Sequence, residues 1–341
     1  MSKNTMNLTE YVLATPLTFE EKEFNMVDSL VLSQLSYVRF EEYDEERIRD
    51  FAKLEYFPKM FKDSIFADEN KELLMAAAIS PRFRDVRIRD AVSRTYEDEQ
   101  FAAMVFDTGL FTYAAFRGTD GTMTGWRENF RLAYLERIPS QIDALEYLRH
   151  HKTDYVGGQS RGGNLAAYAG SQTGAPEIHC FDSPGFRHSI AEQLNGKNVK
   201  KVIAEASVIG VLLEDISDCG YVQCDTSIFH QHSPYSWKIE NDHFVMADRL
   251  SPFSDYLKRV VSGWLLRLPE EDKREFVETL FEILEENGIR TVNDLKGMNL
   301  KDAKNLIGTA HSRDVKDNLK EVLGAFSKES IRIIAEGIKR N

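Results

Sequence analysis

The first clear pattern of apolar and polar positions in this chain is helical. Across residues 20–60, apolar side chains recur at three- and four-residue steps, as on one face of a helix; they are Val27, Leu30, Val31, Leu35 and Val38. Two apolar runs follow, over 101–106 and 110–116, with Asp107-Thr108-Gly109 between them. A short glycine-containing turn between two such runs predicts a β-hairpin.

Beyond the hairpin, the pattern alternates between strand and helix. The glycines of residues 117–121 indicate a loop. Helices are then predicted through Ile142, Leu145 and Leu148 and over 163–170, and strands at 155–156, 178–181 and 201–204. Strands separated by helix-length segments predict βαβ units. The expected fold class is therefore α/β, with a mostly parallel sheet and helices on both faces.

The pattern changes near residue 255, after which only amphipathic helical segments are predicted. One covers 275–284 and ends at Asn287-Gly288, a typical helix end, and another covers 319–338. We therefore divide the chain into an α/β domain over 1–255 and a helical C-terminal region over 256–341. Residues 120–138 mix apolar and charged side chains, which fits either a mobile apolar lid or a helix packed on the sheet.

Composition and charge limit the partners. The chain has 341 residues, 42% of them hydrophobic, which is enough for a sizeable core. Its net charge is −12 and it has no cluster of five or more Lys or Arg residues, so we expect neither nucleic acid nor permanent docking on anionic lipid. The same balance leaves a neutral ester or lipid open as a substrate.

The sequence also bears on the compartment. We find no apolar run of a secretory signal at its start and no stretch approaching the roughly 18 apolar residues of a spanning helix. Cys180, Cys219 and Cys224 suit neither a disulfide framework nor a zinc site. We therefore expect a cytoplasmic protein without stable membrane insertion.

The most specific motif is Gly158-Gln159-Ser160-Arg161-Gly162. It matches Gly-x-Ser-x-Gly, the strand-to-helix turn that presents the nucleophile in α/β-hydrolases. The glycines are needed because larger side chains beside this sharp turn would collide with the strand and the helix. By chance alone the motif occurs in about one chain in ten of this composition, so its weight comes from the β-rich segment before it and the alanine-rich helix after it. We predict that Ser160 is the nucleophile of a serine hydrolase.

The general base should follow this serine, because α/β-hydrolases order their triad Ser, then Asp or Glu, then His. His179 in the predicted strand 178–181 and His188 soon after it are interpreted as structural, and His311 lies in the C-terminal region. Three histidines that fit the order then remain: His230, His232 and His243. We favour His232, since its run follows a predicted last strand and Pro234 marks a loop that would present the imidazole. His230 lies one pleat away on the same side, so both stay open.

The acid of the triad must be buried and fixed, so that it holds the tautomer of the base and stabilises its imidazolium. Asp182 directly follows the predicted strand 178–181, at the carboxyl edge of a parallel sheet, where such sites gather. Its rivals follow the next strand; they are Glu214, Asp215 and Asp218. We favour Asp182.

A tetrahedral oxyanion needs two hydrogen-bond donors. One is expected to be the backbone N–H of Arg161, immediately after the nucleophile. The second is expected from the loop after an earlier strand, where Thr119 offers both an amide and a hydroxyl.

Taken together, these segments resemble the class 3 lipase-like branch of α/β-hydrolases, and more narrowly a group of bacterial lipase-like proteins. The resemblance lies in residues 116–119, Trp126, Asn129 and 158–164, and continues in 181–185, 207–213 and 231–237. It covers roughly residues 25–250, and it implies that Ser160, His232 and the amides of Thr119 and Arg161 take the family's roles. Class 3 lipases usually carry the acid one strand later, where this chain has no carboxylate at 207–210.

Two functions follow from these expectations. The first is a serine ester hydrolase of the lipase or esterase type, which needs no metal or organic cofactor and acts through an acyl-enzyme. Thioester or amide cleavage would use the same site. The second is a non-catalytic protein of the same fold that binds a lipid or acyl ligand and recruits a protein partner through its C-terminal helices.

Overall fold

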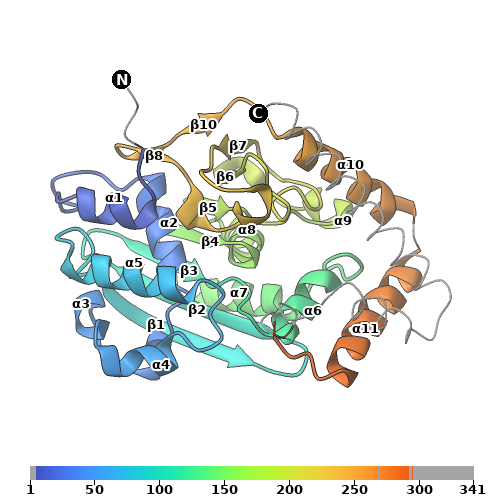
Figure 1. The fold of residues 1–341 in the computed structure, drawn as a ribbon, viewed down its shortest axis with the longest axis horizontal. Coiled ribbons are helices and arrows are strands. Elements are labelled where there is room, and N and C mark those ends of the chain that lie inside the picture. Colours follow the sequence, from blue (N-terminus) through green and yellow to red (C-terminus); the bar gives the residue numbers. More distant parts are fainter. Residues whose placement is uncertain (1–4, 268, 292–293, 295–341) are drawn as a thin grey trace.

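The described residues of the computed structural model, 5–267, 269–291 and 294, contain an eight-stranded sheet (Figure 1). Its order is β1-β2-β3-β4-β5-β6-β7-β10. The strands are β1 (Arg87–Thr95), β2 (Gln100–Asp107), β3 (Thr112–Phe116), β4 (Tyr155–Gln159), β5 (Glu177–Phe181), β6 (Val199–Ala204), β7 (Cys219–Val222) and β10 (Met246–Ala247). Neighbours from β3 to β7 pair in parallel, whereas β1, β2 and β10 pair antiparallel. The mostly parallel sheet predicted from the sequence is confirmed.

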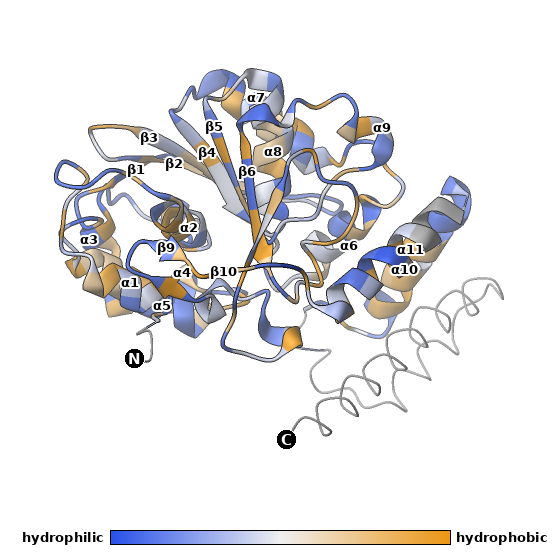
Figure 2. Cartoon of the chain, turned by 90° about the horizontal axis from the view of Figure 1, so that it is seen from above, coloured by the Kyte–Doolittle hydropathy of each residue, from blue (hydrophilic) through white to orange (hydrophobic). Residues whose placement is uncertain are grey.

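Helices cover both faces of this sheet, as Figure 2 shows from above. One face carries α1 (Leu8–Ala14), α2 (Met26–Leu35), α3 (Ile48–Phe51), α4 (Phe57–Met60) and α5 (Ala67–Ile79). The other carries α7 (Pro139–His150) and α8 (Arg161–Thr173), with α6 (Met123–Arg131), α9 (His188–Ala191), α10 (Pro252–Arg267) and α11 (Glu270–Glu286) beyond them. Short elements complete the chain: the 3-10 helices η1 (Phe40–Glu42), η2 (Leu54–Tyr56), η3 (Gly196–Asn198), η4 (Ile228–His230) and η5 (Pro234–Ser236), and the paired strands β8 (Ile239–Glu240) and β9 (His243–Phe244).

Alternating side chains of the central strands form two cores. In β2, Met104 and Phe106 pack with α2 and α5, whereas Ala103 and Val105 pack with α7 and α8. This is the two-residue period of a strand that is buried on both faces. The sheet is therefore a layer between two sets of helices.

The helix predicted from the pattern of residues 20–60 is shorter in the structure. The structure has one regular helix there, α2, followed by short helical turns. Every residue from Val27 to Leu35 is buried, so α2 is a core helix without a polar face. The acidic run at 41–46 interrupts the apolar spacing, and the chain leaves the helix at Ser36.

The hairpin prediction is confirmed, because β2 and β3 pair antiparallel around a turn with Gly109 at φ 85°. Strand β1 was missed, since most of its residues are exposed or half-buried and several are arginines. The predicted end of the helix over 275–284 is also confirmed: α11 ends at Glu286, Asn287 caps it, and Gly288 has φ 75°. The segment 319–338 lies outside the described residues.

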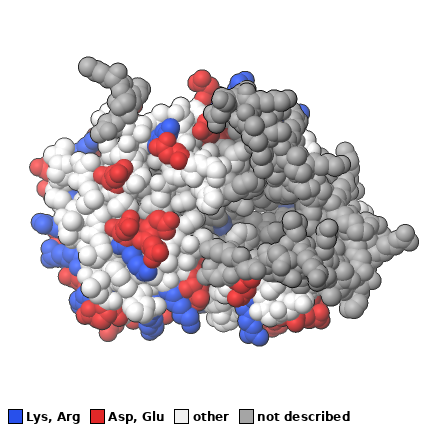
Figure 3. Space-filling model, in the orientation of Figure 1, with Lys and Arg blue, Asp and Glu red and all other residues white. Residues whose placement is uncertain are grey.

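The surface mixes charges of both signs. Acidic and basic side chains alternate over the described part of the face in Figure 3; Arg47 and Arg49, for example, both bind Asp85. Among the residues that the structure describes, no helix has the length and apolar character needed to cross a membrane.

A buried ion pair anchors the N-terminal segment to the core. The side chains of Asp28 in α2 and Arg82 are both fully buried, and Arg82 donates to both carboxylate oxygens, at 2.8 and 2.6 Å. Its remaining donors reach four backbone carbonyls, those of Leu17, Thr18, Lys22 and Glu23. One buried guanidinium thus provides hydrogen bonds for four backbone carbonyls of the segment 17–23.

We predict that Arg82→Met lowers the free energy of unfolding by about 3–5 kcal/mol, because it leaves the Asp28 carboxylate buried without its partner. The control is Arg84→Met, whose side chain is 49% exposed and which should change stability by less than about 0.5 kcal/mol. Urea denaturation followed by tryptophan fluorescence measures both. Equal losses for the two variants would contradict the role of the ion pair.

Candidate active site

The site is organised by the sharp turn between β4 and α8. Ser160 stands directly after β4 with φ 58° and ψ −132°, a conformation that is strained for a residue with a side chain. Its N–H donates to the carbonyl of Phe181 at the end of β5, at 2.8 Å. Arg161 begins α8, so its N–H is among the helix amides that have no partner inside the helix.

The glycines of the motif let three elements touch at this turn. A Cβ on Gly158 would collide with the backbone carbonyl of Gly162, and a Cβ on Gly162 would collide with the carbonyl oxygen of Phe116 in β3. Strand β3, strand β4 and the first turn of α8 are therefore in direct backbone contact. The steric reason for both glycines that was predicted from the sequence applies in the structure.

The structure brings three predicted residues together. The Oγ of Ser160 lies 3.1 Å from Nε2 of His232, and Nδ1 of the same ring lies 2.6 Å from Oδ2 of Asp182. Ser160 is 7% exposed and the Asp182 side chain is fully buried, whereas 26% of the histidine side chain is exposed. The imidazole thus bridges a hydroxyl and a carboxylate at the protein surface.

Asp182 is fixed by the backbone around it. It follows β5 directly with φ 44°, a second strained residue at the carboxyl edge of the sheet. Its N–H donates to the carbonyl of Val202 at 2.9 Å, and its Oδ1 accepts the N–H of Ala204 at 3.3 Å. Its other oxygen, Oδ2, is the one that contacts the histidine.

Hydrogen bonds of two glutamines, Gln159 and Gln231, hold the loop that carries His232. Gln159, inside the motif, donates through Nε2 to the carbonyl of His232 at 3.1 Å and accepts the hydroxyl of Tyr37 at 2.7 Å. Burial raises the pKa of Tyr37, which keeps this hydroxyl a donor. Gln231 accepts the N–H of Ala206 at 2.9 Å, and its own carbonyl accepts the indole N–H of Trp237 at 3.1 Å.

The rival histidines lie in other settings. His230 belongs to the 3-10 helix η4, so the strand pleat that made it equivalent to His232 does not exist. The side chain of His243 is 81% exposed beside Asp242. His179 is buried in β5, where it contacts Ser29 and Glu177.

The rival acids also have other neighbours. Glu214 contacts Nδ1 of His188 at 2.9 Å, and Asp215 accepts a hydrogen bond from the ammonium of Lys201. Asp218 lines a separate polar cleft with Gly196 and Lys197. Of these four carboxylates, all within the described part of the chain, only Asp182 contacts the imidazole of His232.

One predicted oxyanion donor, Arg161, directly follows the serine, and the loop of the other runs beside the serine turn, because a Cβ on Gly118 would stand 2.7 Å from the carbonyl oxygen of Gln159. Thr119, in the loop 117–122 that we call the donor loop, is 3% exposed. The side chain of Arg161 is also buried; it binds Glu128 in α6 and donates to the backbone and side-chain carbonyls of Gln100 at 2.7 and 3.0 Å. Gln100 therefore links the donor loop to Arg161, since its side-chain oxygen also accepts the N–H of Asp120 at 3.1 Å.

Sequence reasoning missed these supporting residues, namely Tyr37, Gln100, Glu128 and Gln159. Gln100 comes directly before an apolar run and Gln159 lies inside the motif. The signal available in the sequence was therefore a polar side chain at a position that the pattern predicts to be buried. Their partners are distant along the chain, from 28 residues between Gln100 and Glu128 to 122 between Tyr37 and Gln159. The described residues contain no cluster of three or more His, Cys, Asp or Glu that could hold a metal ion.

The fold, a mostly parallel sheet with helices on both faces, is that of an α/β protein of the α/β-hydrolase type. The chain belongs to the Mbeg1-like family, a lipase-like family whose model matches residues 77–282. The match begins in α5 and ends in α11, so it includes the serine turn, the donor loop and part of the C-terminal helical region. No curated protein and no solved structure matches the chain.

We predict that Gly162→Ala lowers the free energy of unfolding by about 2–3 kcal/mol, because its Cβ would displace the backbone of β3. The control is Gly174→Ala at the end of α8. Gly174 has φ 71° and open space around its Cβ position, so that substitution should cost only about 1 kcal/mol of backbone strain. Denaturant unfolding compares them, and equal losses would mean that the close approach at the turn carries no steric constraint.

Proposed function

We propose that this protein is a serine hydrolase that cleaves carboxylic esters, of lipids or of other acyl groups, through Ser160, His232 and Asp182. The observation that carries the proposal is the pair of contacts at the imidazole, 3.1 Å to the serine and 2.6 Å to the aspartate. The family's lipase-like character supports the class of reaction. The motifs that resemble class 3 lipases support that branch, and the three free cysteines fit an activity in the cytoplasm.

In the first step, Ser160 Oγ attacks the ester carbonyl while Nε2 of His232 takes the hydroxyl proton. Asp182 holds the Nδ1–H tautomer and stabilises the imidazolium that forms. The negative oxygen of the tetrahedral intermediate accepts hydrogen bonds from the N–H of Arg161 and from Thr119. The intermediate collapses, His232 gives its proton to the leaving alcohol, and the acyl group stays on the serine.

In the second step, water attacks the acyl-enzyme. His232 removes a proton from the water, the tetrahedral intermediate forms at the same donors, and the carboxylic acid leaves as Ser160 recovers its proton. The helix that begins at Arg161 points the positive end of its dipole at the same oxygen. Every proton in this cycle passes through one histidine.

Reaction with a fluorophosphonate probe tests the proposed nucleophile. We expect the folded wild-type protein to be labelled, with the adduct on the peptide that contains Ser160, and to hydrolyse p-nitrophenyl esters. Ser160→Ala should abolish labelling and lower turnover on the order of 10⁵-fold. Ser233→Ala, beside the histidine, is the matched control and should still be labelled. Folded wild-type protein that stays unlabelled would instead favour the non-catalytic ligand-binding protein.

Two separate substitutions test the proposed acid. Asp182→Asn should lower turnover by about 10⁴-fold, because an amide favours the wrong tautomer of His232. Asp215→Asn should leave turnover close to wild type and lower stability instead, since Asp215 pairs with the buried Lys201. Steady-state kinetics with p-nitrophenyl butyrate separates the two. The assignment of the acid is wrong if only Asp215→Asn abolishes turnover.

A further inference from the structure

The donor loop is held by α6, the helix that follows it. Nδ2 of Asn129 donates to Oγ1 of Thr119 at 2.6 Å. Gly125 also packs against the loop, because a Cβ on it would stand 2.7 Å from Cγ2 of Thr119 and would collide with it. Since the threonine oxygen accepts from Asn129, its own proton is free to donate to another group. The position of α6 therefore sets both the place and the direction of this donor.

Helix α6 is in turn held by α11, which comes from the C-terminal helical region. Three side chains of residues 127–134 converge on one carboxylate of α11, that of Glu278: Arg127 donates at 2.8 Å, Arg131 at 2.8 and 3.1 Å, and the hydroxyl of Tyr134 also donates to it. Burial opposes ionisation of Glu278, but these hydrogen bonds lower its pKa to about 2. The carboxylate is therefore charged at neutral pH.

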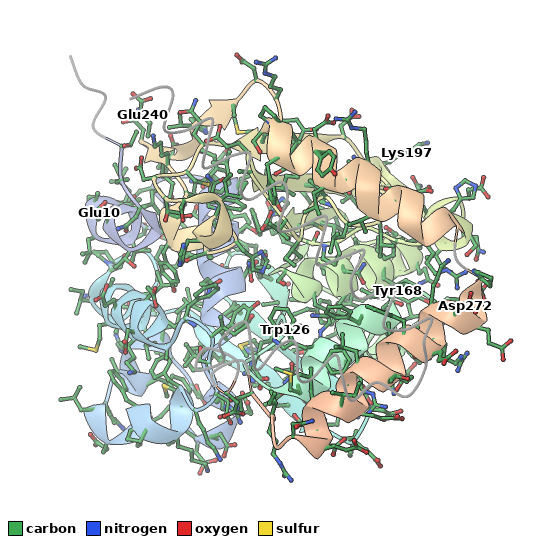
Figure 4. All side chains as sticks on the ribbon, turned by 45° about the vertical axis from the view of Figure 1, so that its right-hand side comes forward. Glu10, Trp126, Tyr168, Lys197, Glu240 and Asp272 are labelled. Carbon is green, nitrogen blue, oxygen red and sulfur yellow. The ribbon has the colours of Figure 1, made fainter. Side chains whose placement is uncertain are left out.

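Apolar contacts and a backbone hydrogen bond also join α6 to α11 and to the residues that follow α11. The rings of Phe130 and Phe281 meet edge to face with centroids 5.4 Å apart. Phe281 also belongs to an apolar cluster that α11 forms with Met123 and Trp126 of α6. Just beyond α11, the carbonyl of Arg290 accepts the N–H of Met123, the first residue of α6, at 2.8 Å. Figure 1 shows the two helices side by side, and Figure 4 labels the half-buried Trp126 of α6 near the middle of the view and Asp272 at the outer end of α11.

We propose that α11 is a brace for the oxyanion donors, and that Glu278 and Asn129 are positioning residues that act in sequence on Thr119. This inference rests on the proposed function, since it assigns to the helical C-terminal region the task of keeping the donor loop in its reactive position. Residues 120–138, predicted as a lid or as a helix on the sheet, are in this proposal the link between the brace and the loop.

The full-length chain provides the test, with two isosteric substitutions. Asn129→Asp replaces the donor by an acceptor of the same shape, which draws the Thr119 proton away from the oxyanion; kcat for p-nitrophenyl butyrate should fall about 10- to 100-fold with KM within about twofold. Glu278→Gln removes the negative charge that pairs with Arg127 and Arg131, so it weakens the contact between α6 and α11. It should lower kcat by about 3- to 10-fold. Hydrogen exchange should rise in residues 117–135 of this second variant.

The matched control is Glu282→Gln, one turn further along α11, where the side chain is exposed. It should leave kcat and hydrogen exchange at wild-type values. If wild-type protein reacts with the fluorophosphonate probe but Asn129→Asp and Glu278→Gln both keep wild-type kcat, the brace is overturned and the proposed function stands. If wild-type protein does not react at all, the proposed function is overturned, and the positioning role is overturned with it.

Discussion

The site depends on one steric constraint, the contact of three backbones where β4 turns into α8. Gly158 and Gly162 leave no room for a Cβ between β3, β4 and the helix, so the chain can only pass through a strained residue, and that residue is Ser160. The strain is balanced by the N–H bond of Ser160 to β5 and by the packing of α8 on the sheet. The turn thereby places the serine hydroxyl next to Nε2 of His232, with the first amide of α8 directly after it in the chain.

The other site residues lie where neighbouring strands end. Because parallel strands end at the same edge of the sheet, Asp182 after β5 comes close to Ser160 after β4. A second strained backbone and an N–H bond to β6 hold its carboxylate in place. The loop with His232 enters from beyond β7 and is fastened through Gln159, so the turn that presents the serine also fixes the proposed base.

Local patterns explain what could be predicted from the sequence. The serine turn is a five-residue motif, and the positions of Thr119 and Asp182 follow from strand ends that apolar runs reveal. The distinction between His230 and His232 could not be made, because the same residues fit a strand or, as found, the 3-10 helix η4. Strand β1 was not predicted, because most of it is exposed or half-buried and it is rich in arginine. The helix predicted over 20–60 is longer than α2, because a fully buried helix has no polar face to mark its end. The contacts of Asn129 and Glu278 join residues 10 and 144–151 positions away from them, which no local pattern reports.

The most direct test of this account is a crystal structure of the protein after reaction with a phosphonate ester, which mimics the tetrahedral intermediate. The account predicts phosphorus bonded to Oγ of Ser160, with the phosphoryl oxygen about 2.7–3.1 Å from the N–H of Arg161 and from a donor of Thr119. Phosphorus on another side chain, or a phosphoryl oxygen that turns to solvent away from both donors, would contradict it.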